Sequence, residues 1–206
     1  MTINKSIATR LIVFPPLILQ LISLEDNAPG GNHDELDFEL LGRNGPPYVL
    51  STNVFAQDSG NREQQFNLWF DPTSDFHDYA ILWNQYQIVF YVDKIPVRVF
   101  ENNTYSGAKY PNLPMYVHGS LWNASQWLGP TDWSQGPFYA NYRGFEVYGC
   151  TRSNAQNCER SWKAPHYRKL SAEEQRIYET TKAKYMTYDY CKSNSGKSFP
   201  ECKIAN

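Results

Sequence analysis

The 206-residue chain lacks several patterns that mark common functional classes. Its 19 Lys and Arg residues nearly balance its 21 Asp and Glu residues, so the composition indicates no surface for a nucleic acid or another polyanion. The sequence contains no phosphate-binding loop and no Ser, His and Asp in the order of a hydrolase triad. Metal-ligand spacing is also missing from the four histidines, which are His33, His77, His118 and His166. We therefore expect no cofactor, no metal and no nucleic-acid partner.

Cysteine is scarce, with four residues: Cys150, Cys158, Cys191 and Cys202. No two of them have the C-x-x-C spacing of a zinc site, which disfavours that use. Four cysteines permit three disulfide pairings, and disulfides imply an oxidising compartment.

Only one stretch, residues 1–23, resembles a targeting segment. A basic start followed by the apolar run 11–22 is typical of a signal peptide, although no small-residue cleavage site follows. Because the run is short and contains Pro15 and Pro16, it does not fit a membrane span, and we expect no stable membrane insertion. The alternative is that residues 11–21 simply form a β-strand.

The most informative stretch is residues 33–42, which read His-Asp-Glu-Leu-Asp-Phe-Glu-Leu-Leu-Gly. A strand has a side-chain period of two, so Glu35, Asp37 and Glu39 share one face. The opposite face carries Leu36, Phe38 and Leu40. Three neighbouring carboxylates repel one another, which raises the pKa of at least one and lets a protonated and an ionised carboxyl coexist.

This pair of protonation states is what a retaining glycosidase requires. One carboxylate attacks the anomeric carbon and a protonated one serves as acid and then base, at a separation of roughly 5–5.5 Å. The backbones of Glu35 and Glu39 are about 13 Å apart in a strand, so their side chains must lean inward over Asp37. The alternative is a solvated face of an edge strand with no chemical role.

The strand closely resembles the active-site strand of the plant xyloglucan endotransglucosylase/hydrolases, within glycoside hydrolase family 16. The resemblance runs from about residue 24 to residue 202. It includes the motifs STNVF at 51–55, GNREQ at 60–64, LWFDPT at 68–73, FHDY at 76–79, ILWN at 81–84, PM at 114–115, GSLWNA at 119–124 and YRGF at 142–145. It implies that Glu35 is the nucleophile, Asp37 an electrostatic helper and Glu39 the acid/base.

The resemblance also implies the fold. We expect an all-β protein, an antiparallel β-sandwich of jelly-roll (concanavalin-like) type with a short, disulfide-bonded α-helical extension at its C-terminus. The expected parts are residues 1–23, a sandwich over 24–149 and the extension over 150–206. Family members carry several strands ahead of the catalytic strand, and this chain has no room for them. We therefore expect an incomplete sandwich with an unpaired edge beside the three carboxyls and poor activity.

Strands are predicted at 48–56, 64–70, 79–83, 86–92, 95–100 and 139–149. A capping box at Ser171 and Glu174 predicts a helix that runs to about Tyr188. Sequence proximity and the family both favour the pairs Cys150–Cys158 and Cys191–Cys202. Two glycosylation sequons begin at Asn102 and Asn123.

The family uses two further groups of residues to hold sugar. Its donor-side contacts correspond to Ser51, Thr52, Asn53, Asn61, Arg62 and Glu63. Ser51 stands where the family more usually has Gln. For Arg62 and Glu63, which are adjacent to each other, the alternative is an ordinary ion pair on the surface. On the acceptor side, the rings of Trp122, Trp127 and Trp133 could stack on a glucan chain, and Leu128 is a further predicted contact; the alternative is that these tryptophans belong to the core. The loop after Trp127 is shorter than usual, which leaves acceptor specificity open.

The function implied by the resemblance is retaining transfer on xyloglucan, with donor and acceptor xyloglucan chains as partners. The acceptor is a sugar end or water, and the sequence leaves this open. A monomer secreted to the cell wall or apoplast is expected. A second hypothesis, from another class, is a catalytically impaired product that at most binds glucan.

Overall fold

A computed structural model of the chain describes residues 7–12, 17–25, 33–42, 46–57, 59–113, 115–144, 146 and 164–204. For the first two ranges only the backbone is described. The chain separates into two compact units, which are treated one at a time. The first unit comprises residues 1–8, 77–102 and 142–184, and the second comprises 9–76, 103–141 and 185–206. The predicted boundaries after residues 23 and 149 stay predictions.

The first unit is built on three consecutive strands, β6 (His77–Trp83), β7 (Gln87–Val92) and β8 (Ile95–Glu101). Neighbouring strands pair antiparallel, so the three form a meander. Their apolar side chains are buried, as the predicted strands at these positions require. Strands β1 (Ile7–Ile12) and β10 (Tyr139–Arg143) each contribute residues to both units.

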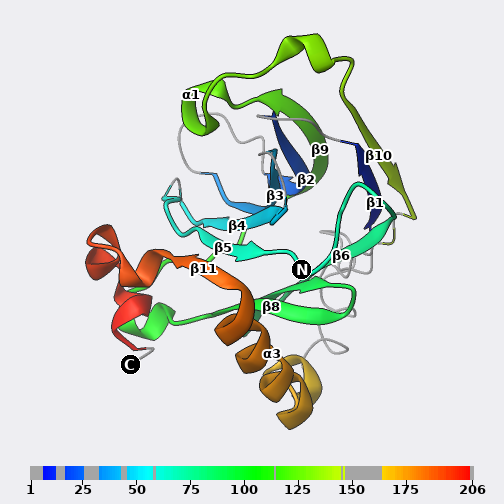
Figure 1. The fold of residues 1–206 in the computed structure, drawn as a ribbon. Coiled ribbons are helices and arrows are strands. Elements are labelled where there is room, and N and C mark those ends of the chain that lie inside the picture. Colours follow the sequence, from blue (N-terminus) through cyan, green and yellow to red (C-terminus); the bar gives the residue numbers. More distant parts are fainter. Residues whose placement is uncertain are drawn as a thin grey trace. The chain divides into compact units, whose positions relative to one another are not determined.

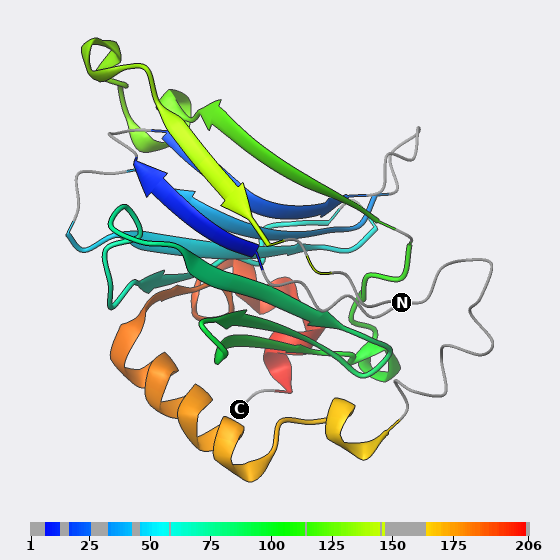
Figure 2. The ribbon, with the colours of Figure 1, turned by 90° about the vertical axis from the view of Figure 1, so that its right-hand side faces the viewer.

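Helix α3 (Ala172–Tyr185) belongs to this unit up to Lys184 and runs past the meander on one side (Figure 2). Its predicted capping box is confirmed: Ser171 N donates to Glu174 Oε2 at 2.9 Å, and Glu174 N donates to Ser171 Oγ at 3.2 Å. The 3-10 turn η3 (Pro165–Tyr167) precedes the helix, and the carbonyl of Tyr167 accepts a 2.9 Å hydrogen bond from Asn84 Nδ2.

The second unit contains a six-stranded antiparallel sheet in the order β11-β5-β4-β3-β2-β9 (Figure 1). The strands are β2 (Leu17–Glu25), β3 (Glu35–Leu41), β4 (Val49–Phe55), β5 (Gln64–Asn67), β9 (Tyr116–Asn123) and β11 (Met186–Asp189). Three short helical segments also belong here, namely η1 (Thr104–Ser106), α1 (Ser125–Leu128) and η2 (Trp133–Gln135).

One face of β3 and β4 is apolar and buried. Leu36, Phe38 and Leu40 are almost fully buried, as predicted. Their cross-strand partners on β4 are Val54, Thr52 and Leu50. Cross-strand partners share a face of a sheet, so Thr52 points with this apolar group. Burial of these side chains fixes the register of β3, because a slip of one residue would exchange its two faces.

The expectation of an unpaired edge beside the catalytic strand is wrong. Strand β2 pairs antiparallel with β3 along one side, while β4 pairs with it along the other. Strand β9 in turn pairs with the far side of β2. Residues 7–12 and 17–25 are β-strands, in agreement with the alternative that the N-terminal segment forms a strand.

The helix predicted to reach Tyr188 ends at Tyr185, and residues 186–189 form β11 instead. Strand β11 pairs with β5, with Met186 opposite Phe66 and Asp189 opposite Gln64. The backbone groups of this segment therefore find partners in the sheet rather than in another helical turn. The predicted strand at 64–70 is correspondingly shorter and ends at Asn67.

After β11 the chain forms three 3-10 turns, η4 (Tyr190–Lys192), η5 (Ser195–Ser198) and η6 (Pro200–Lys203). The predicted disulfide Cys191–Cys202 is confirmed, with Cα atoms 5.2 Å apart. Cys150 and Cys158 lie outside the described residues.

Candidate active site

The three carboxyls of β3 share the face opposite the apolar group. Glu35, Asp37 and Glu39 alternate with the buried Leu36 and Phe38, as the period of two predicts. Asp37, in the middle, is only 2% exposed, and the Glu35 side chain is 15% exposed. The site thus removes carboxyl groups from water while leaving part of the outer two accessible.

Strand register places Glu39 in a row that crosses the whole sheet. Cross-strand partners, taken from β11 to β9, are Tyr188, Gln65, Ser51, Glu39, Gln20 and Ser120. Because paired residues point to the same face, the side chains of Tyr188, Gln65, Ser51 and Ser120 share a face with the acidic group. In the neighbouring row, Asn53 and His118 share a face with Asp37. The face around the carboxyls is therefore mainly polar.

Burial raises the pKa of the Glu39 carboxyl from its ordinary value of 4.5 to about 7. Repulsion from the carboxylate of Glu63 and then from that of Glu35 adds to this shift. The Ser51 hydroxyl lowers the pKa, although its Oγ has no hydrogen-bond partner of normal geometry. Glu39 can consequently hold a proton near neutral pH.

Glu35 has a partner that sequence reasoning missed. His33 Nε2 lies 3.2 Å from Glu35 Oε2, and the His33 ring stacks in a tilted arrangement on Phe55, with centroids 5.2 Å apart. His33 and Glu35 are two residues apart in sequence, so the alternation that grouped the carboxyls would also have placed this histidine beside the first of them.

Asp34 was also missed. Its buried carboxylate accepts backbone hydrogen bonds from Gln57 at 2.8 Å, Asn112 at 2.6 Å and Leu113 at 2.9 Å. It therefore ties two loops to the start of β3 and fixes the position from which Glu35 begins. Sequence reasoning could not have found these contacts, because they connect residues far apart in the chain.

The donor-side residues divide between the two faces. Ser51 and Asn53 pair with Glu39 and Asp37 and share their face, as predicted. Asn53 Nδ2 donates to Glu63 Oε1 at 3.3 Å, which brings Glu63 to the same group. Asn61 is exposed and has a left-handed backbone with φ of 58°, which asparagine tolerates in turns.

Two predicted donor-side contacts do not fit this geometry. Thr52 lies on the apolar face, and its hydroxyl donates to the carbonyl of Gln64 at 3.3 Å. Arg62 is 1% exposed, and its Nε donates to Glu201 Oε1 at 2.6 Å. The alternative of a surface pair also fails for Arg62, because its partner is buried Glu201. Both residues have structural roles in the described conformation.

The predicted acceptor-side residues lie near the end of β9. Trp122, 41% exposed, is in one row with Leu41 and hence on the face of the carboxyls. Trp127 on α1 is 46% exposed, whereas Leu128 packs against the small apolar cluster of Leu41 and Ala124. Half-exposed indole faces of this kind can stack on sugar rings.

Within the described ranges, no three His, Cys, Asp or Glu side chains gather closely enough to bind a metal ion. The described helices are also too short or too polar to cross a membrane.

The site contains an ionisable carboxyl, a carboxyl that can hold a proton and a third carboxyl between them. Such a set supports acid/base and nucleophilic chemistry at a glycosidic bond.

A protonated carboxyl and an ionised carboxyl in one site are what proteins that cleave glycosidic bonds with retention use. The sequence pattern described as "Glycosyl hydrolases family 16" matches residues 17–142, and the chain belongs to this family. The family resemblance drawn from the sequence is thereby confirmed.

Similar curated proteins come from plants. The chain is 48% identical over 188 residues to "Xyloglucan endotransglucosylase/hydrolase protein 3" of Arabidopsis thaliana, covering 84% of this chain and 64% of that protein. It is 47% identical over 192 residues to "Xyloglucan endotransglucosylase/hydrolase 1" of Glycine max, covering 86% and 65%. The chain thus spans just under two thirds of the length of these relatives.

Solved structures support the fold. A Bacillus licheniformis beta-glucanase matches with a TM-score of 0.60 and 23% identity, covering 73% of this chain and 69% of that one. The structure titled "Apo Crh5 transglycosylase" matches with a TM-score of 0.62 and 23% identity, covering 73% and 64%. The predicted fold class, an antiparallel jelly roll with a disulfide-bonded helical extension, is confirmed.

Proposed function

We propose that the chain carries out retaining glycosyl transfer on xyloglucan. The observation that carries this proposal is Glu39, a carboxyl with a pKa near 7 on the same strand face as Glu35. Such a pair supplies an acid and a nucleophile at once. The names of the similar plant proteins support xyloglucan as the substrate class.

In the first step a Glu35 carboxylate oxygen bonds to the anomeric carbon of the donor chain as the glycosidic bond breaks. Glu39 gives its proton to the departing oxygen, which leaves as a hydroxyl. In the second step a hydroxyl of another xyloglucan end, or of water, attacks the same carbon. Its proton passes to Glu39, the ester bond to Glu35 breaks, and the original configuration is restored.

The remaining residues bind or orient. His33 orients the Glu35 carboxylate through its 3.2 Å contact, and Asp37 lies between the two reacting carboxyls as an electrostatic helper. Donor-side contacts are proposed for Ser51, Asn53, Asn61 and Glu63. Acceptor-side contacts are proposed for Trp122, Trp127 and Leu128, and Leu128 also packs against Leu41 and Ala124.

We propose secretion to the cell wall as a monomeric glycoprotein, supported by the Cys191–Cys202 disulfide. Of the two sequons, Asn123 is the better acceptor. It is exposed, and the hydrogen bond from Ser125 N at 2.9 Å falls on its Oδ1. The reactive Nδ2 of Asn102 instead already donates to the carbonyl of Gln85 at 2.8 Å.

The test is transfer of xyloglucan to a fluorescent xyloglucan oligosaccharide, followed by size-exclusion chromatography. Fluorescence in the polymer fractions, which requires the chain and disappears in Glu35→Ala, supports transfer. Release of new reducing ends without fluorescent polymer would mean that water is the acceptor. Binding to xyloglucan without either product would contradict the proposal and favour the second candidate, a non-catalytic glucan binder.

A further inference from the structure

The residues between β4 and β5 are held by the C-terminal segment, here residues 186–202. Arg62 reaches into this segment: its guanidinium donates to Glu201 at 2.6 Å and lies over the ring of Phe199 at 4.6 Å. The guanidinium also donates to the carbonyl of Ser59. Both charged partners are buried, so the ion pair is shielded from water and salt.

Glu201 is fixed from within the segment as well. The Tyr190 hydroxyl donates to Glu201 Oε1 at 3.3 Å, and the adjacent Cys191 and Cys202 form the disulfide. The other oxygen, Glu201 Oε2, is buried with no hydrogen-bond partner. A buried pair that is incompletely hydrogen-bonded contributes little net stability but strongly resists separation. Its effect is therefore mainly to fix position.

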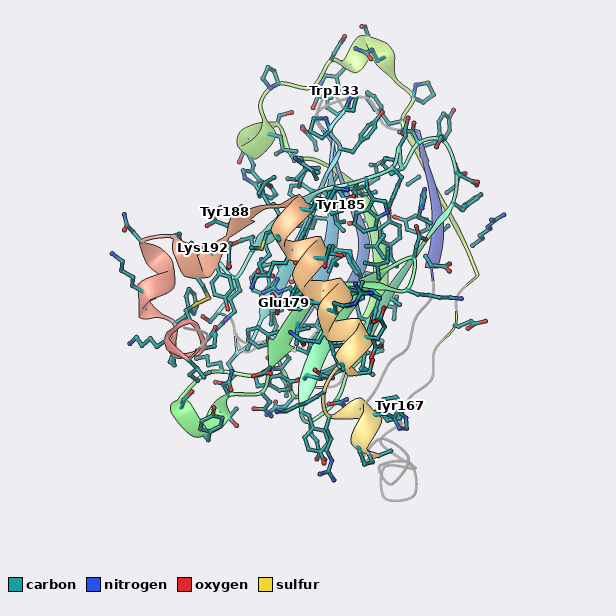
Figure 3. All side chains as sticks on the ribbon, turned by 60° about the horizontal axis from the view of Figure 1, so that its bottom comes forward. Trp133, Tyr167, Glu179, Tyr185, Tyr188 and Lys192 are labelled. Atoms are coloured by element: carbon teal, nitrogen blue, oxygen red, sulfur yellow. A yellow bond between two sulfur atoms is a disulfide. The ribbon has the colours of Figure 1, made fainter. Side chains whose placement is uncertain are left out.

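Glu63 and Gln64, the residues after Arg62, are held by the same segment. Tyr190 N donates to the carbonyl of Glu63 at 3.0 Å, and Gln64 Nε2 donates to Asp189 Oδ1 at 3.2 Å. From the other side, Asn53 Nδ2 donates to the Glu63 carboxylate at 3.3 Å. Glu63 is thus fixed between β4, which carries part of the active face, and the C-terminal segment (Figure 3 labels Tyr188 and Lys192 on that segment).

The charge of Glu63 acts on the acid/base. After burial, it is the largest influence on the Glu39 pKa and exceeds that of Glu35. The other described groups in the rows of the three carboxyls include no lysine or arginine. They are Asp37 on β3, Phe55, Asn53 and Ser51 on β4, Gln65 on β5, Tyr188 on β11, and Tyr116, His118 and Ser120 on β9.

We propose that Glu63 is a further positioning residue for glycosyl transfer and that the C-terminal segment fixes it beside Glu39. This role rests on the proposed function and is separate from any sugar contact of Glu63. A carboxylate at this place favours the protonated form of Glu39, so that the enzyme retains its acid at neutral pH. The C-terminal segment thereby influences the chemistry through Glu63.

The direct test is an NMR titration of the substrate-free protein with ¹³C-labelled glutamate carboxyls, in which the Glu39 signal is identified by its loss in Glu39→Gln. We expect a midpoint near 7 in the wild type and roughly one pH unit lower in Glu63→Gln. The matched control is Glu179→Gln, an exposed glutamate on α3, which should leave the midpoint unchanged. An unchanged midpoint in Glu63→Gln overturns the proposal.

The kinetic counterpart is the alkaline limb of kcat/KM for xyloglucan, which reports the free enzyme. In Glu63→Gln this limb should move to lower pH, with a loss on the order of fivefold at pH 7 and none at pH 5. A uniform loss at both pH values would indicate a sugar contact alone and would contradict the proposal. If the wild type does not act on xyloglucan but the NMR midpoint still falls, the proposed function fails while the coupling stands.

The role of the C-terminal segment is tested with Glu201→Gln and Tyr190→Phe. Both should shift the Glu39 midpoint in the direction of Glu63→Gln. The shift should be smaller for Tyr190→Phe, because it removes one hydrogen bond to Glu201 and keeps the ion pair between Glu201 and Arg62. Should Glu201→Gln fail to fold, Tyr190→Phe decides. Wild-type midpoints in every folded variant of the segment would overturn this part.

Discussion

The two faces of β3 are made from alternate residues of one strand, yet they serve different ends. Leu36, Phe38 and Leu40 are buried and gain free energy from leaving water. Glu35, Asp37 and Glu39 lose free energy by being partly or fully buried, and the raised pKa of Glu39 measures that cost. One face of β3 therefore stabilises the fold, and the opposite face carries the chemically active groups.

The comparison teaches why the acidic face can persist. The apolar face sets the register of the strand, and register alone places the three carboxyls together. Burial of the three carboxyls can therefore cost free energy without changing the position of the strand that carries them. Substitutions on the acidic face should consequently change mainly activity, and substitutions on the apolar face should change mainly the free energy of unfolding.

The largest expected effect is on the acidic face. Glu39→Gln should lower transfer from natural xyloglucan by about 10²- to 10⁴-fold, because the leaving oxygen loses its proton donor. An aryl glycoside with a good leaving group should be far less affected. Initial rates with both donors check this, with Glu179→Gln as the control. An equal loss with the two donors would argue against an acid role.

On the apolar face, Phe38→Ala should lower the free energy of unfolding by about 3–5 kcal/mol, since it opens a cavity at a fully buried site. Activity per folded molecule should stay close to that of the wild type. Denaturant unfolding gives the first quantity, and active-site titration followed by kinetics gives the second. Loss of activity in the folded fraction would show that the faces are not separable.

A third prediction concerns pH and stability. The pKa of Glu39 is raised from 4.5 to about 7 on folding, so its contribution is most favourable below 4.5 and is lost as pH rises through 7. Glu39→Gln should therefore match the wild type at pH 4 and become more stable than it above pH 7, by about 3 kcal/mol. Unfolding midpoints at several pH values check this; a constant difference would contradict it.

The smallest effect is expected at Trp122. Replacing this half-exposed residue with Ala should raise the KM for the acceptor by roughly 2- to 10-fold, through loss of stacking, while unfolding changes little. Competition between labelled acceptors of different length measures the first effect and thermal unfolding the second. A large drop in stability with an unchanged KM would place Trp122 with the core instead.

Local pattern predicted much of this arrangement. Alternation identified both faces of β3, and the capping box at Ser171 and Glu174 identified the start of α3. The pair Cys191–Cys202 followed from proximity and from the family. Thr52 should have been removed from the donor side by the same alternation, because it pairs with Phe38.

The misses depend on partners that are distant in sequence. The sequence of residues 186–189 fits a helix, and these residues form a strand because they pair with β5. Likewise, β2 is identified as a strand by its pairing with β3 and β9. Arg62 resembles a surface residue because Glu201 lies 139 positions further along the chain. No local pattern contains such information.

The central claim is that Glu35 forms the covalent intermediate. The most direct measurement treats the protein with an activated 2-fluoro glycoside of a xyloglucan oligosaccharide and locates the adduct by peptide mass spectrometry. We predict one oligosaccharide on Glu35 itself, located by fragmenting the peptide that also carries Asp37 and Glu39. We predict none in Glu35→Ala, and continued labelling in Glu39→Ala because the reagent needs no acid. An adduct that persists in Glu35→Ala, or that lies on Asp37 or Glu39, would contradict the claim.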